Sequence, residues 1–122
     1  TIRRFFESFG RMALVEERLI HAVVCVSGSS PAYVYLFLEA LADSGVKYGL
    51  PRDLAYEMAA QAVLGSARML METGEHPGRL KDQVCSPGGT TIAAVEALEE
   101  HGLRNAVMKG CDACFEKCGN IR

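Results

Sequence analysis

The sequence predicts an all-α domain of about six or seven helices, and three observations indicate it. Helix-forming residues fill long segments of the 122-residue chain. Almost no segment alternates apolar and polar residues with the period of a β-strand. Clusters of Gly, Pro and Ser separate the segments at intervals that suit helices and short turns. A chain of this length is expected to form one domain.

The first residues are the exception to the helical pattern. Residues 2–9 form a short amphipathic segment that stops at Gly10, and residues 11–17 suit an extended crossing. A helix is expected from Glu16 to Val26, because acidic residues in a first turn complement the helix dipole. The Ser-Gly-Ser-Ser-Pro stretch at 27–31 ends it. Ser29 or Ser30 can cap the next helix, which covers 31–45.

The rest of the chain reads as helices joined by short turns. After Gly-Leu-Pro at 49–51, a long helix covers 52–73 and ends before Gly74. Shorter helices follow at 76–84 and 90–101, and a last one at 103–118. There are no repeats and no long linkers.

Two of these helices predict a partner chain. Residues 32–42 are apolar all around the helix axis, with Glu39 as the only charge, so the helix must be covered on every side. Residues 58–67 are rich in Ala, Gly and Ser, which let helices approach closely. Both helices could be ordinary core helices, but together they favour a dimer interface. A buried Glu39 would then need an ion-pair partner.

Composition excludes several classes of partner. The net charge is −2 and no basic run stands out, so nucleic acid is not expected. We find no apolar stretch of the roughly 18–20 residues that a bilayer requires, so no membrane partner is expected either. The five cysteines have no framework spacing, which favours reduced thiols and a cytoplasmic location.

The cysteines and histidines provide few catalytic patterns. Cys111, Cys114 and Cys118 share one helical face and could bind metal or act in redox chemistry. A structural zinc site needs four ligands, however, so we expect no metal and read these cysteines as core residues. The histidines at 21, 76 and 101 are scattered and suit surface or turn positions. The chain contains no G-x-G-x-x-G motif for a dinucleotide.

The most informative segment is Ser-Pro-Gly-Gly-Thr-Thr at 86–91, directly before a helix. The glycines permit a tight turn, and Thr90 or Thr91 can cap the helix. Amide groups at a helix start also suit a carboxylate, phosphate or sulfate. From this chemistry alone, a plain capped turn and an anion site are equally open.

Three segments carry a resemblance to a known family. The segments that begin SGSSPAYVYLFLEALADSG, AAQAVLGSARMLMETGEHPGRLKD and VCSPGGTTIAAVEALEEHG resemble the C-terminal domain of pyrroline-5-carboxylate reductase. The similarity extends from about residue 10 to the last helix. It implies an enzyme that reduces 1-pyrroline-5-carboxylate to proline with NADPH or NADH, the last step of proline biosynthesis.

The resemblance also implies an organisation and a site. Residues 1–15 would be a linker from an absent N-terminal dinucleotide-binding domain, which would hold the cofactor. Residues 16–122 would be the helical dimerisation and substrate-binding domain, interlocked with a second chain in a homodimer or an oligomer of dimers. The implied substrate-binding residues are Ser86, Gly88, Gly89, Thr90 and Thr91, with Pro87 in the same loop. Thr91 would contact the ring nitrogen and is the implied catalytic residue.

The alternatives differ in class. The chain could be a stand-alone helical dimerisation module without catalysis, or a cysteine-based metal or redox protein. On the enzyme hypothesis, the 122-residue chain alone is inactive, because it has no place for the dinucleotide.

Overall fold

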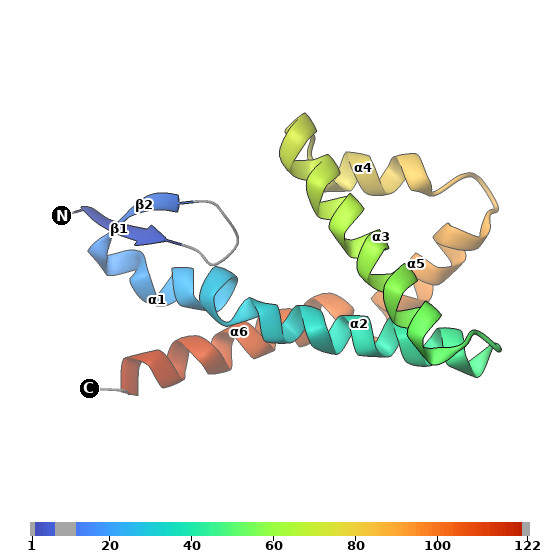
Figure 1. Ribbon diagram of the computed structural model, residues 1–122. Helices are drawn as coiled ribbons and strands as arrows, with labels where there is room; N and C mark the ends of the chain where they lie inside the picture. Colours follow the sequence, from blue (N-terminus) through green and yellow to red (C-terminus); the bar gives the residue numbers. More distant parts are fainter. Residues whose placement is uncertain (1, 7–11, 121–122) are drawn as a thin grey trace. The chain divides into compact units, whose positions relative to one another are not determined.

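The computed structural model describes residues 2–6 and 12–120 (Figure 1). The chain divides into two compact units. The first contains the N-terminal segment through Tyr35 together with the C-terminal residues from Arg104, and the second is Leu36–Leu103. From residue 17 to residue 120 the regular structure is helical, which confirms the all-α fold class for this part of the chain.

A two-stranded antiparallel ribbon precedes the helices. Strand β1 (Ile2–Phe6) pairs with β2 (Met12–Glu16), with Ile2 opposite Glu16 and Phe6 opposite Met12. The extended conformation expected near residues 11–17 is therefore confirmed for β2. The helix expected from Glu16 starts one residue later. The strand at 2–6 was not predicted, because a pairing of two short strands leaves little periodicity to read.

The first helical run changes its winding twice. It passes from the 3₁₀ turn η1 (Glu17–Leu19) to α1 (Ile20–Val23) and then to the π turn η2 (Val24–Gly28). The amide of Ser29 donates to the carbonyl of Val24 at 2.8 Å, five residues back, as a π turn requires. The Ser30 hydroxyl donates to the Val26 carbonyl at 2.6 Å. The segment 27–31 thus widens the helix where the sequence predicted a break.

Helix α2 (Ser30–Lys47) turns sharply into α3 (Arg52–Thr73). Gly45 suits the close packing at this turn, since an added Cβ would lie 3.1 Å from Leu50 Cδ1 and 3.3 Å from Ala55 Cβ, and these neighbours would have to move slightly. An ion pair between Asp43 and Arg52 joins the two helices. The turn brings the small residues at the end of α2 and the start of α3 into contact.

The remaining helices follow the expected boundaries closely. Gly74 ends α3 in the left-handed conformation at φ 67°, and its amide donates to the Leu70 carbonyl. Helices α4 (Pro77–Val84), α5 (Thr90–Glu100) and α6 (Leu103–Asn120) complete the chain. Short local signals, Pro at a helix start and Gly past its end, fix most of these positions.

The interior of the single chain is very small. Among residues 16–119, the buried apolar side chains are Cys25, Ala42, Ala55 and Ala59. Large apolar side chains of α2 stay in solvent, with Tyr35 60% and Leu36 67% exposed. A folded domain of this size normally buries most of its large apolar residues. The large apolar side chains of α2 therefore stay largely uncovered in the single chain.

Glu39 is exposed in the single chain, because the helix around it is uncovered, so the ion pair expected for a buried Glu39 stays a prediction. The expectation that no apolar stretch could span a bilayer is wrong. The helical run Glu17–Lys47 has 31 residues and contains an 18-residue stretch with a mean hydropathy of 1.4, so it is long and apolar enough by length and composition to cross a membrane. Only 6% of this 18-residue stretch is buried within the chain, in keeping with the apolar surface that α2 leaves exposed.

Candidate functional site

The loop between α4 and α5 is a tight turn. Pro87 and Gly88 occupy its tip, and the Gly89 amide closes it by donating to the Ser86 carbonyl at 3.1 Å. Gly88 has φ 68°, a left-handed conformation that side chains with a Cβ rarely adopt. Gly88 therefore suits the turn because of its backbone conformation.

Gly89 is favoured by the space around it, not by its backbone angle. Its φ of −87° and ψ of −179° are ordinary for an extended residue. A Cβ at this position would lie 2.6 Å from the Ser86 hydroxyl oxygen and 3.2 Å from the Ser86 carbonyl oxygen. The absence of a side chain lets the Ser86 hydroxyl lie against the start of α5.

The N-terminus of α5 has no side-chain cap. Gly89 is the N-cap residue, and no side chain accepts a hydrogen bond from the first turn. The prediction that Thr90 or Thr91 caps this helix is wrong, because the helix begins at Thr90 and both threonines lie inside its first turn. Thr90 is exposed and Thr91 is half-buried.

This geometry favours an anion. The first amides of a helix have no intrahelical acceptor, and the positive end of the helix dipole lies with them. Of the amides in the loop, that of Gly89 is already used within the turn. The amides of Thr90 and Thr91, with the hydroxyls of Ser86 and the two threonines, are the groups this loop offers to a carboxylate.

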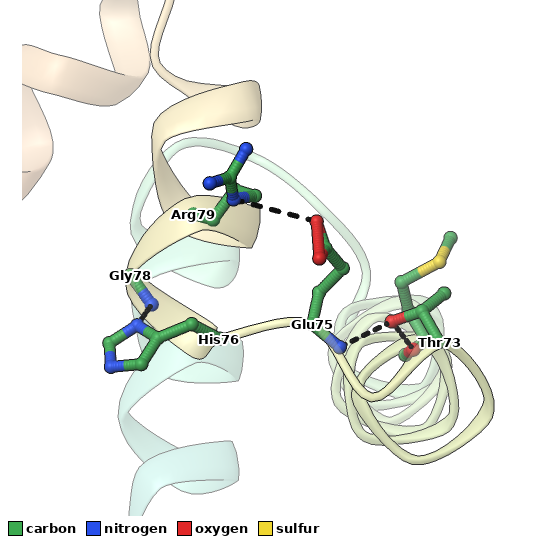
Figure 2. Close-up of polar contacts among 6 residues, drawn as sticks. Thr73, Glu75, His76, Gly78 and Arg79 are labelled. Atoms are coloured by element: carbon green, nitrogen blue, oxygen red, sulfur yellow. Dashed lines mark hydrogen bonds and ion pairs between the residues drawn. The ribbon is translucent and has the colours of Figure 1, made fainter.

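The preceding turn, between α3 and α4, is held by local polar contacts (Figure 2). His76 is the N-cap of α4, and its Nδ1 accepts from the Gly78 amide at 2.9 Å. The Thr73 hydroxyl donates to the Met69 carbonyl at 2.7 Å and accepts from the Glu75 amide at 3.2 Å. A Glu75–Arg79 ion pair spans the start of α4 at 3.6 Å. A shallow hollow beside this turn is lined by His76, Gly78, Arg79, Asp82 and Gln83.

The histidines are structural, as the sequence predicts, and the structure does not bring them together with the loop. His76 caps α4, as described. His101 follows α5, and its Nδ1 lies 2.9 Å from the Ala97 carbonyl. His21 meets the ring of Phe115 edge-on at 6.0 Å. The loop itself contributes amides and hydroxyls, which are groups that suit holding and orienting a ligand.

Sequence reasoning missed one cluster. The three cysteines of α6 share their face with Cys25, whose thiol lies 3.4 Å from the Cys111 carbonyl. The Cys114 sulfur lies 3.5 Å from the Ser29 hydroxyl. The four-residue spacing of Cys25 and Ser29 places them on one face of the first helical run and was visible in the sequence. Their partners on α6 lie 85 or more residues away, so the sequence did not show that the two faces meet. Within residues 2–6 and 12–120, no group of three or more His, Cys, Asp or Glu side chains is arranged to hold a metal ion.

Fold and loop together define a class: a helical domain with a large exposed apolar surface and a tight turn before one helix whose uncapped amides suit an anion. The comparisons with known proteins give the family. A family model described as pyrroline-5-carboxylate reductase dimerisation matches residues 17–121. The chain belongs to this family, which supports oligomerisation through this domain.

Relatives that bear the reductase name cover nearly all of this chain. It is 59% identical over 116 residues to the pyrroline-5-carboxylate reductase of Escherichia coli strain K12, across 95% of this chain and 43% of that protein. It is 50% identical to the reductase of Glycine max, across 95% of this chain and 42% of that protein. The chain thus spans less than half the length of these curated relatives.

Solved structures show the same fold. The reductase of Streptococcus pyogenes matches with a TM-score of 0.86 and 42% identity, over 88% of this chain and 41% of that one. The Plasmodium falciparum enzyme, whose structure has NADP bound, matches with a TM-score of 0.81 and 38% identity, over 84% of this chain and 39% of that one.

Proposed function

We propose that this chain is the dimerisation and substrate-binding part of a pyrroline-5-carboxylate reductase. The intact protein would reduce 1-pyrroline-5-carboxylate to proline with NADPH or NADH. The observation that carries the proposal is the uncapped N-terminus of α5 behind the Ser86–Gly89 turn. It offers hydrogen-bond donors to a small anionic substrate, in a chain whose relatives bear the reductase name.

The loop residues would divide the work of holding the substrate. The amides of Thr90 and Thr91 and the Ser86 hydroxyl would bind the carboxylate, while Gly88 and Gly89 allow the turn its shape. The Thr91 hydroxyl would hydrogen-bond to the ring nitrogen and orient the C=N bond. Holding the C=N bond in a fixed position relative to a hydride donor would speed hydride transfer, because positioning lowers the entropic part of the activation barrier.

The cofactor is expected to bind mainly outside this chain, which contains no G-x-G-x-x-G motif. When bound, a reduced nicotinamide supplies the hydride. The part of the protein before residue 16 would connect to the domain that holds it. We propose no metal in the reaction, since the donors of residues 86–91 are amides and hydroxyls, which suit an anion.

We also propose that the partner is a second copy of this chain, in a homodimer or an oligomer of dimers. The exposed apolar side chains of α2 and α3, among them Leu36, Leu54 and Met58, support an interface of helices. Cover by a second chain also accounts for the apolar run Glu17–Lys47 without a membrane. All five cysteines are free thiols, which supports a cytoplasmic location.

An enzyme assay tests the proposal directly. The full-length protein that carries this chain should oxidise NADPH or NADH only when 1-pyrroline-5-carboxylate is present, and should form proline. The 122-residue chain alone should not oxidise either cofactor. A full-length protein that dimerises but forms no proline would support the alternative, a dimerisation module without catalysis.

A further inference from the structure

The cysteine cluster of the first unit contains two rows of side chains, one on the first helical run and one on α6, which contact each other. His21, Cys25, Ser29 and Tyr33 recur every four residues along the first helical run, which includes the π turn η2. Cys111, Cys114 and Cys118 share one face of α6. Cys25 and Cys111 contact each other reciprocally, because each sulfur lies against the other's carbonyl, at 3.4 and 3.9 Å.

Cys114 is the centre of this cluster. Its sulfur lies 3.5 Å from the Ser29 hydroxyl, and the hydrogen-bonding groups of Tyr33, Cys25 and Cys118 lie near enough to influence its pKa. These donors, with Ser29 the largest contributor, lower the pKa of Cys114 despite its partial burial.

The neighbouring groups keep their protons. Burial, followed by the hydrogen bond to Cys114, raises the pKa of Cys25 to about 11. The hydrogen bond to Cys114, followed by burial, raises the pKa of Tyr33 to about 12. Burial also raises the pKa of Cys118. The directions of these shifts make Cys114 the thiol of the cluster that loses its proton most readily, beside groups that can donate hydrogen bonds to its sulfur, which is the environment of a reactive thiol.

We propose that Cys114 is a hydroperoxide-reactive thiol and that Cys25 is the residue with which it then forms a disulfide. The Cys114 thiolate attacks a peroxide oxygen, the O–O bond breaks, and the sulfur is oxidised to a sulfenic acid while hydroxide leaves and takes up a proton as water. The Cys25 thiol then attacks that sulfur, the S–O bond breaks, and a second water leaves with the Cys25 proton. The hydroperoxide is the oxidant and accepts both electrons.

Geometry selects Cys25 over the cysteines of α6. Residues three or four apart on a helix have Cβ atoms about 5–6 Å apart. A disulfide needs Cβ atoms about 3.5–4.5 Å apart, so Cys111 and Cys118 cannot pair with Cys114 without unwinding α6. Cys25 comes from a different segment, its sulfur lies 3.4 Å from the Cys111 carbonyl on the same face of α6, and the thiols of Cys25 and Cys114 influence each other's pKa. The resulting disulfide would link the first helical run covalently to α6.

Peptide mapping of the full-length protein tests the proposal. Within this chain, trypsin separates residues 19–47, which hold Cys25, from 110–117 and from 118–122. After treatment with hydrogen peroxide and without reduction, we expect residues 19–47 linked to 110–117, with fragment ions that assign the bond to Cys114. Bonds from Cys114 to Cys118, to Cys85 or to a second chain in place of this one would overturn the proposal.

Variants separate the two steps. Cys25→Ser should let the Cys114 sulfenic acid accumulate, where dimedone traps it, while Cys114→Ser should abolish both the adduct and the disulfide. Cys85→Ser, which removes a half-buried thiol outside the cluster, is the matched control and should change nothing.

A measurement on the unaltered protein covers the case in which a variant does not fold. Iodoacetamide should alkylate Cys114 several-fold faster than Cys85 at neutral pH, and the difference should widen as the pH falls. Equal rates for the two thiols would overturn the proposal.

Discussion

The Ser86 hydroxyl lies where a side chain at Gly89 would have to go, with 2.6 Å between Oγ and an added Cβ. This relationship predicts the effect of Gly89→Ala. The Ser86 side chain must rotate out of its place, at a cost on the order of 1 kcal/mol, and the Ser86 carbonyl remains tight against the new methyl group. Chemical denaturation should report the loss.

The second variant in this test is Ser86→Ala. It should recover part of the stability that Gly89→Ala loses, because it removes the colliding oxygen. Gly88→Ala is the matched control: an added Cβ there meets nothing within 4 Å, and its cost comes from the φ of 68° alone. If Ser86→Ala restored the stability of Gly88→Ala as much as it restores that of Gly89→Ala, this explanation would be contradicted.

Thr91→Ala should lower catalysis in the full-length protein and leave stability nearly unchanged. Thr91 does not cap α5, so the helix loses little, whereas a substrate nitrogen loses its partner. A hydrogen bond left unmade at a buried group costs about 1–3 kcal/mol, which is roughly a tenfold to hundredfold loss in kcat/KM. Thr90→Ala, at the exposed neighbour, should cost less. Equal kcat/KM for Thr91→Ala and the unaltered protein would remove Thr91 from the site.

An anion should bind the loop even without the cofactor domain. Titration of the 122-residue chain with sulfate or proline, followed by amide NMR, should shift the Thr90 and Thr91 resonances most. The Gly89 amide should move less, because it already donates to Ser86. We expect weak binding, since the cofactor side of the proposed pocket is missing. Shifts confined to the hollow around His76 would place the anion elsewhere.

The helix boundaries were largely predictable, because local residues set them. The long helix predicted at 52–73 has those bounds in the structure, since Pro51 precedes it and Gly74 can adopt the left-handed conformation that ends it. The π turn was not predictable, since its widened hydrogen bond from Ser29 to Val24 gives no sequence periodicity. The exposure of Glu39 was missed because the sequence does not say which chain provides the cover.

The candidate site was predicted in composition but not in detail. The Ser-Pro-Gly-Gly-Thr-Thr segment identified the loop, and the structure changed the roles within it: Gly89 takes the N-cap position and the threonines do not cap. The catalytic role of Thr91 stays a prediction. Cys25 was missed because its partners on α6 are distant in sequence and only folding brings them together.

The Leu36→Glu variant should show whether the protein is the proposed dimer or a stable monomer. Leu36 is 67% exposed in the single chain, so a charge there costs little unless a partner covers it. Burial of a leucine is worth about 1.5–3 kcal/mol, and both chains would lose it. Light scattering should show twice the chain mass for the unaltered protein and for Leu36→Met, and dissociation or unfolding for Leu36→Glu. A Leu36→Glu protein that keeps the mass and stability of the unaltered one would exclude α2 from the interface.

Metal removal should have no effect. Protein purified without added metal should contain zinc and iron far below one atom per chain, and dialysis against a chelator should leave the melting temperature unchanged. The physical reason is the arrangement of the ligand groups: within residues 2–6 and 12–120, no three or more His, Cys, Asp or Glu side chains are placed to hold a metal ion. Stoichiometric metal that survives dialysis would contradict this prediction.

The small interior of the single chain has a consequence for how the protein forms. With Cys25 and three alanines as the buried apolar residues among 16–119, a lone chain has little to hold it folded. Folding and association would then be one event, as in obligate dimers, and dilution would act as a denaturant. The melting temperature should rise with protein concentration. When isotopically labelled and unlabelled samples of the protein are mixed, the rate of chain exchange between dimers should not exceed the rate of unfolding.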